Sequence, residues 1–141
     1  MKKYILLLII SLFFVGCTDN ENSNKNPYIP NYNFSVDLNL NLPLYSNLKN
    51  PSNGIYYSDA GVKGIIVFNT GNGNYNAFDA ACPNQEISNC STMTIKGINA
   101  LCACDSKEYN LFTGQATTTA TYPMKQYRVE AISETQIRIY N

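Results

Sequence analysis

Four cysteines in the second half of the chain are the residues best suited to chemistry: Cys82, Cys90, Cys102 and Cys104. The chain contains no histidine. Histidine is the commonest catalytic acid–base and the commonest metal ligand, so its absence excludes a Ser-His-Asp triad, a Cys-His pair and any His-bearing metal site made by this chain alone. Thiol chemistry remains, either as disulfides in an oxidising compartment or as thiolate ligands of iron or zinc.

The N-terminal segment indicates the compartment. Lys2 and Lys3 precede an apolar stretch at 4–15, and Gly and Cys17 close it, which is the layout of a secretory signal. The apolar stretch, about twelve residues, is shorter than the roughly twenty that cross a bilayer. Residues 14–17, Phe-Val-Gly-Cys, resemble the lipobox of bacterial lipoproteins. The resemblance implies a signal peptide at 1–16 and a diacylglycerol thioether on Cys17.

These features predict a lipoprotein that is anchored on the extracytoplasmic side of the cell envelope, at the periplasmic face or the outer membrane. Its first partner would be the lipid bilayer, through acylated Cys17, and ordinary secretion is the alternative. Residues 17–33 are rich in Asn and poor in apolar side chains, so we expect a flexible tether there. Without Lys2 and Lys3, eight of the ten basic residues remain beside ten acidic ones. This balance, without a basic stripe, gives no support to a nucleic-acid partner.

Beyond the tether, the pattern of side chains predicts strands. Apolar and polar residues alternate over 34–42, which is typical of a half-buried strand. The Gly/Asn-rich stretch at 70–74 lies between two strand-like segments and predicts a hairpin. The segments with strand character are 34–42, 55–57, 65–68, 75–79, 93–95, 100–102, 108–111, 126–129 and 136–139. Many short strands without a helical period predict one all-β domain over 34–141, an antiparallel sandwich or small barrel.

The segments around the cysteines resemble a known family. Residues 77–84 (AFDAACPN) are similar to the first cluster loop of Rieske [2Fe–2S] domains, in which Cys-x-His follows an apolar strand. Residues 102–115 (CACDSKEYNLFTGQ) align without a gap with the second loop, which reads Cys-Pro-Cys-His-Gly-Ser. The resemblance covers nearly all of 34–141 and extends to a Rieske-like subgroup of bacterial lipoproteins. It implies a Rieske-like fold with a separate cluster-loop subdomain.

The departures from the family fall on the ligands. Two Cys and two His hold a Rieske cluster. Cys82 and Cys102 stand at the thiolate positions, but Asn84 and Asp105 stand where the two His belong. Ser106 and Lys107 replace a Gly and a Ser of the second loop, whereas Tyr109 keeps the aromatic position behind the cluster. Because an amide oxygen is a poor ligand for iron, we expect a degenerate site without a cofactor, in a protein with a binding or structural role rather than an enzyme.

The resemblance also implies a disulfide pairing. In the family, the residues at positions 82 and 102 share one iron, so their side chains lie close enough for a bond between Cys82 and Cys102. Cys104 corresponds to a second-loop Cys that pairs with a first-loop Cys in some members, and Cys90 would be its partner here. A bond between Cys102 and Cys104 would close a small, strained ring.

Other interpretations remain open at this stage. The main alternative is a [2Fe–2S] electron-transfer protein in which Cys82 and Cys102 ligate together with Cys90, Cys104 or Asp105. Four thiolates could also bind zinc, although their spacing suits zinc poorly. The eleven tyrosines are compatible with carbohydrate stacking, and Asp79, Asp105 and Glu108 are compatible with paired carboxylates of a hydrolase. The sequence names no envelope protein as a partner.

Overall fold

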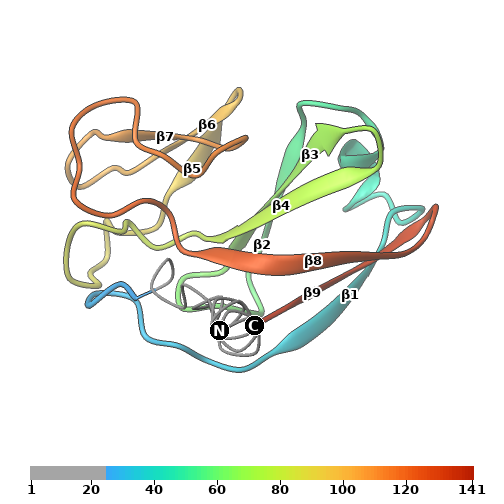
Figure 1. Ribbon diagram of the computed structural model, residues 1–141, viewed down its shortest axis with the longest axis horizontal. Helices are drawn as coiled ribbons and strands as arrows, with labels where there is room; N and C mark the ends of the chain where they lie inside the picture. The colour runs from blue at the N-terminus through green and yellow to red at the C-terminus, as the bar shows by residue number, and fades with distance from the viewer. Residues whose placement is uncertain (1–24) are drawn as a thin grey trace, which may run out of the picture.

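The computed structural model describes residues 25–141, and this part of the chain is all-β, as predicted (Figure 1). It has nine strands and one short 3-10 helix, η3. Their bounds are β1 Ser35–Asn39, η3 Ser46–Lys49, β2 Gly54–Tyr57, β3 Ile65–Gly71, β4 Asn74–Asp79, β5 Thr94–Lys96, β6 Asn99–Leu101, β7 Glu108–Asn110, β8 Gln126–Ser133 and β9 Gln136–Tyr140. None of the described helices is long and apolar enough to cross a membrane. The predicted signal peptide 1–16 and Cys17 lie outside the described residues.

The strands form two antiparallel sheets. The larger has the order β1-β9-β8-β4-β3-β2, and Figure 1 shows it curled into a half-barrel. The smaller has the order β5-β6-β7 and lies at one end of the larger sheet. This arrangement agrees with the predicted small barrel that carries a separate subdomain.

Strand β3 separates two hydrophobic cores. Its side chains at Ile65 and Val67 join a core between the two halves of the curled sheet, whereas Ile66 and Phe68 join a second core beneath the small sheet. All four residues are fully buried. A strand buried on both faces reads as a continuous apolar run rather than an alternating one, which explains the sequence at 65–68. The second core also holds Cys82 and Cys102, so the cysteines belong to a packed interior.

The hairpin predicted at 70–74 is confirmed, and it joins β3 to β4. Gly71 pairs with Asn74, and the two residues between them, Asn72 and Gly73, have φ of 53° and 75°. Two successive positive φ angles are what a two-residue hairpin loop of type I′ requires, and an Asn-Gly pair supplies them at low cost.

The first strand is shorter than the alternation at 34–42 predicts. Strand β1 ends at Asn39, whose side chain accepts a hydrogen bond from the backbone N–H of Asn41 at 2.9 Å. The backbone N–H of Leu42 bonds to the carbonyl of Asn39 at 3.0 Å, which turns the chain. As a result Leu42 is half exposed. The local hydrogen bonds of Asn39 replace the sheet ladder that the apolar pattern favoured.

The predicted tether boundary at residue 33 also needs correction, because residues 26–32 pack against the domain. Ile29 is buried, and the Nζ of the buried Lys125 donates hydrogen bonds to the carbonyl of Pro30 and to Asn31 Oδ1. The Asn26 side chain donates to the carbonyl of Pro83 at 2.7 Å. The Asn-rich composition concealed these contacts, since their partners lie far along the sequence.

Candidate functional site

The four cysteines form two bonds that tie the same two loops together. The first loop follows β4, and the second follows β6. Cys82 is bonded to Cys102 with a Cα–Cα distance of 5.6 Å, and Cys90 is bonded to Cys104 with a Cα–Cα distance of 5.2 Å. The structure therefore has the pairing that the family resemblance implied.

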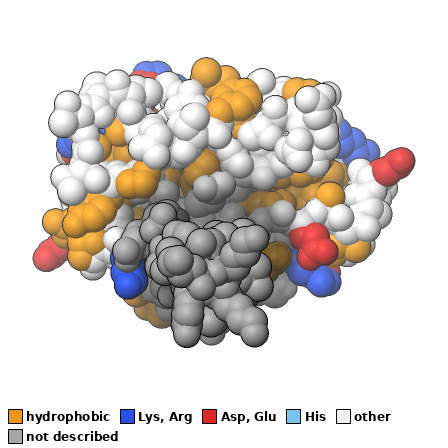
Figure 2. All heavy atoms as spheres, in the orientation of Figure 1, with side chains coloured by type: hydrophobic (Ala, Val, Ile, Leu, Met, Phe, Trp, Pro, Cys, Tyr) orange, Lys and Arg blue, Asp and Glu red, His pale blue; other side chains and the backbone are white. Residues whose placement is uncertain are grey.

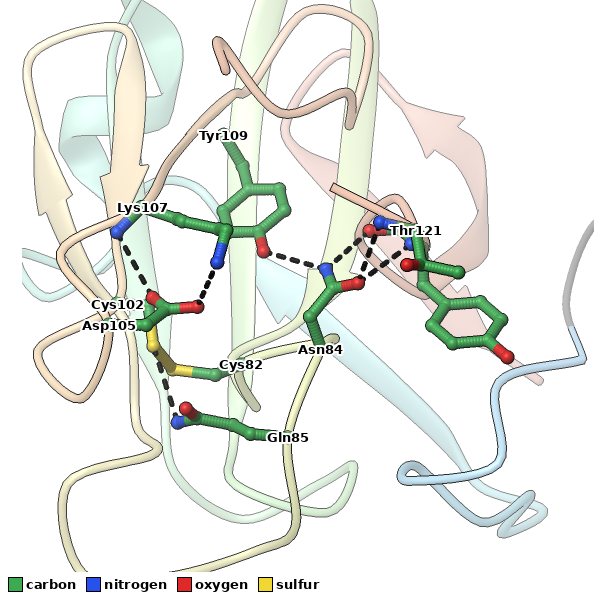
Figure 3. Close-up of polar contacts among 9 residues, drawn as sticks. Cys82, Asn84, Gln85, Cys102, Asp105, Lys107, Tyr109 and Thr121 are labelled. Carbon is green, nitrogen blue, oxygen red and sulfur yellow. Dashed lines mark hydrogen bonds and ion pairs between the residues drawn. A yellow bond between two sulfur atoms is a disulfide. The ribbon is translucent and has the colours of Figure 1, made fainter. Parts of the chain in front are cut away.

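Asn84 lies in the first loop and anchors it to a distant segment. Its Nδ2 donates to the Tyr109 hydroxyl at 2.9 Å and to the Tyr122 carbonyl at 2.8 Å. Its Oδ1 accepts from the backbone N–H groups of Thr121 at 3.0 Å and Tyr122 at 2.8 Å. Figure 3 shows the side chain pointing toward Tyr109 and Thr121 rather than toward the bond between Cys82 and Cys102. Both ends of the amide are thus engaged in holding the loop.

The residues of the second loop bond to one another. Asp105 Oδ1 accepts the backbone N–H of Lys107 at 3.0 Å, and its Oδ2 lies 3.1 Å from the Lys107 Nζ. Between them Ser106 adopts a φ of 58°, a conformation that glycine adopts at lower cost. The backbone N–H of Cys102 closes the loop on the Lys107 carbonyl at 2.9 Å. Asp105 therefore neutralises a neighbouring lysine.

Tyr109 and Gln85 complete the surroundings of the bond between Cys82 and Cys102, which we call the inner bond. The Tyr109 residue is fully buried in the second core, and burial raises the pKa of its phenol, against the smaller opposing effect of the hydrogen bond from Asn84. Gln85 Nε2 lies 3.5 Å from Cys102 Sγ (Figure 3). The polar groups here thus satisfy one another.

The acidic residues that could suggest a hydrolase have separate partners. Buried Asp79 accepts hydrogen bonds from the backbone N–H groups of Val62, Lys63 and Ala81 at 2.6, 3.3 and 2.7 Å, and from the Tyr127 hydroxyl at 2.6 Å. The pKa of Tyr127 is raised, mainly because the phenol is buried and to a smaller extent because its hydroxyl donates to the Asp79 carboxylate. The sequence did not reveal this role of Asp79, because its only local signal is an acidic residue at the end of a strand, after Ala77 and Phe78.

Glycine at position 61 makes the close approach to Asp79 possible. Gly61 has a φ of 74°, and a Cβ there would lie 2.7 Å from Asp79 Oδ2.

Glu108 has its own partners, with Lys96 Nζ at 2.5 Å and Asn99 Nδ2 at 2.9 Å from its carboxylate oxygens. The hydrogen bond from Lys96 is the main cause of the lowered pKa of Glu108. The three carboxylates therefore do not form a catalytic pair.

The donor set does not fit an iron–sulfur cluster or a zinc ion as arranged. Within residues 25–141 no three acidic, Cys or His side chains come close enough to hold a metal. All four thiols are used in S–S bonds, the Asn84 amide is hydrogen-bonded at both ends, and Asp105 is paired with Lys107. A metal would need these contacts to break first.

A polar groove of about 590 Å³ lies where β4 and β8 stop pairing. The two strands pair at two positions, Ala77 with Tyr127 and Phe78 with Gln126. The walls of the groove include Tyr75, Arg128 and Tyr140, and the Arg128 guanidinium lies 6.0 Å from the centre of the Tyr140 ring. None of the ion pairs among the described residues involves Arg128. The groove is a second place, besides the loops, at which a ligand could bind.

Comparisons with known proteins give only distant structural similarity. No family model and no curated protein matches the chain. The chain is similar to a solved structure of the small subunit of a putative NADH-dependent nitrite reductase from Mycobacterium tuberculosis, with 15% identity, a TM-score of 0.48, and 79% of this chain and 97% of that chain covered.

Two further structures contain ferredoxins. A complex of reduced oxygenase and oxidised ferredoxin in carbazole 1,9a-dioxygenase matches with 21% identity and a TM-score of 0.46, covering 64% of this chain and 82% of that chain. The ferredoxin of carbazole 1,9a-dioxygenase from Nocardioides aromaticivorans IC177 matches with 16% identity and a TM-score of 0.45, covering 64% and 86%. Similarity at this level does not assign the chain to a family.

Proposed function

We propose that this protein is a membrane-tethered lipoprotein whose Rieske-like domain has no cluster and serves as a binding or structural module outside the cell membrane. One observation carries the proposal: the two cysteines at the family's thiolate positions, Cys82 and Cys102, are bonded to each other inside a closed core. In that state they offer no thiolate to iron.

The Rieske-like assignment is supported by the two loops whose sequences resemble the cluster loops. Residues 82–91 and 102–107 lie against each other, joined by both S–S bonds. Tyr109 is buried next to them, at the position where the family has an aromatic residue.

The loss of the cluster is supported by the contacts of the residues at the two His positions. The side-chain oxygen and nitrogen of Asn84 both form hydrogen bonds, to the segment at 121–122 and to Tyr109. Asp105 forms an ion pair with Lys107. A residue that replaces a ligand and then makes structural bonds indicates a scaffold that is used for another purpose.

A binding role is supported by the groove beside β8 and by the exposed face of the domain. In the view of Figure 2, charged side chains are few and lie near the outline of the molecule, and scattered hydrophobic side chains lie among the white polar atoms. The groove offers the Arg128 cation beside the Tyr140 ring, and no ion pair within residues 25–141 uses this cation. These groups suit a ligand that carries a carboxylate and an apolar surface.

The membrane anchor gives the first testable prediction. Changing Cys17→Ser is expected to abolish incorporation of labelled palmitate when the full chain is expressed in bacteria, because the diacylglycerol thioether requires the sulfur. Cys90→Ser, which alters a cysteine far from the lipobox, is the matched control and should retain the label. Palmitate on the Cys17→Ser protein would contradict the anchor.

A further inference from the structure

The two S–S bonds of the domain differ sharply in their access to solvent. Cys82 and Cys102 are 1% and 0% exposed and lie in the second core. Cys90 is exposed and Cys104 is half-buried, and all residues from 86 to 90 are exposed. A thiolate from outside can reach only the second pair without opening the core. Attack on a disulfide depends on such access.

A hydroxyl group lies beside both sulfurs of the bond between Cys90 and Cys104, which we call the outer bond. Ser88 Oγ is 3.4 Å from Cys90 Sγ and 3.6 Å from Cys104 Sγ. Disulfide sulfurs carry no proton, so the hydroxyl is the donor in both contacts. A hydrogen bond to a sulfur becomes stronger when that sulfur becomes an anion. Ser88 is thus placed to stabilise the thiolate that leaves when the bond is cleaved.

We propose that the bond between Cys90 and Cys104 is a thiol–disulfide exchange site for an external dithiol, whereas the bond between Cys82 and Cys102 is structural. A thiolate of the dithiol attacks Sγ of the exposed residue Cys90 and forms a mixed disulfide, and Cys104 leaves as a thiolate that accepts a hydrogen bond from the Ser88 hydroxyl. The second thiol of the dithiol then attacks the dithiol's first sulfur, which is bonded to Cys90 in the mixed disulfide. This attack closes a disulfide within the dithiol and releases Cys90 as a thiol. The dithiol loses two electrons and two protons, and Cys90 and Cys104 gain them.

The contacts of the two loops indicate what this exchange would change. The segment 86–90 has the outer bond as its covalent link to the second loop. Cys82 remains bonded to Cys102, and the backbone N–H of Cys82 remains bonded to the carbonyl of Ser91 at 2.8 Å. Reduction would therefore remove the covalent link of the exposed segment to the second loop and leave the core closed, while the hydrogen bonds between Ser88 and the buried Ser91 remain. This inference does not depend on the proposed binding role.

The test is stepwise reduction of the folded, oxidised protein. Treatment with dithiothreitol without denaturant, followed by iodoacetamide and peptide mass spectrometry, should give two alkylated cysteines, Cys90 and Cys104. Reduction of the inner bond should be slower by a factor on the order of 100 or more, because the core must open first. Simultaneous reduction of both bonds, earlier reduction of the inner bond, or resistance of both would overturn the proposal.

Two further measurements examine the chemistry of the site. A thioredoxin variant that lacks its resolving cysteine should become trapped on Cys90, and trapping on Cys82 or Cys102 would contradict the proposal. Ser88→Ala should slow reduction about fivefold and raise the pKa of the Cys104 thiol in the reduced protein. Asn89→Ala, a change at the neighbouring exposed position, should leave both unchanged. An unaltered rate and thiol pKa in Ser88→Ala would remove Ser88 from the mechanism and overturn that part of the proposal.

Discussion

Replacing Asp79 with asparagine is expected to lower the free energy of unfolding by about 3 kcal/mol, because a buried charged acceptor with several donors would be lost. The carboxylate is fully buried and accepts hydrogen bonds from the loop at 61–64, from Ala81 and from Tyr127. An asparagine amide would turn an N–H₂ group toward some of these donors. Urea unfolding followed by circular dichroism measures the loss.

A matched control is available on the surface. Asp37 forms an ion pair with Arg138, with 2.7 Å between carboxylate oxygen and Nε, and both side chains are exposed. Asp37→Asn should change stability little, since exposed ion pairs contribute little. If Asp79→Asn were as mild as Asp37→Asn, the hydrogen bonds of Asp79 would not hold the loop at 61–64 and strand β8 in place as the structure indicates.

Changing Asn84→Ala is expected to cost about 2–3 kcal/mol, because it removes four hydrogen bonds and leaves partly buried partners without a substitute. Those partners are the hydroxyl of Tyr109 and the backbone of Thr121 and Tyr122. Thermal unfolding monitored at several wavelengths gives the loss. Hydrogen exchange should show the change at the backbone N–H groups of Thr121 and Tyr122, which donate hydrogen bonds to Asn84 Oδ1.

Gln85→Ala serves as the control for Asn84→Ala. Gln85 is the next residue in the same loop and makes one contact, to the Cys102 sulfur at 3.5 Å, so its loss should cost about 0.5 kcal/mol or less. Equal effects of the two changes would mean that Asn84 is merely a substituted ligand position without a structural task of its own.

Much of the fold could be predicted because its signals are local. Strand β3 begins with an apolar run, and the Asn72-Gly73 pair after it specifies the turn into β4. The cysteine pairing was accessible through the resemblance of two loops to a known family, whose geometry brings Cys82 and Cys102 together. The spacing of the cysteines alone leaves three pairings open.

The features that escaped prediction depend on contacts between distant residues. The segment 26–32 looks like a tether because its composition is polar, yet Lys125, 95 residues after Pro30, holds it in place. Asn84 looks like a lost ligand, and only the folded chain shows its bonds to the segment 121–122, 37 and 38 residues away. Neither contact leaves a pattern in the local sequence.

The content of iron and acid-labile sulfide tests the central claim most directly. The domain should be made without its signal peptide in the reducing cytoplasm of iron-replete cells, where S–S bonds do not compete for the thiols, and purified without oxygen. We expect far less than one iron pair per chain and a colourless protein, because Asn84 and Asp105 do not replace imidazole as ligands. Stoichiometric iron and sulfide, with visible absorption, would contradict the account and establish the electron-transfer alternative.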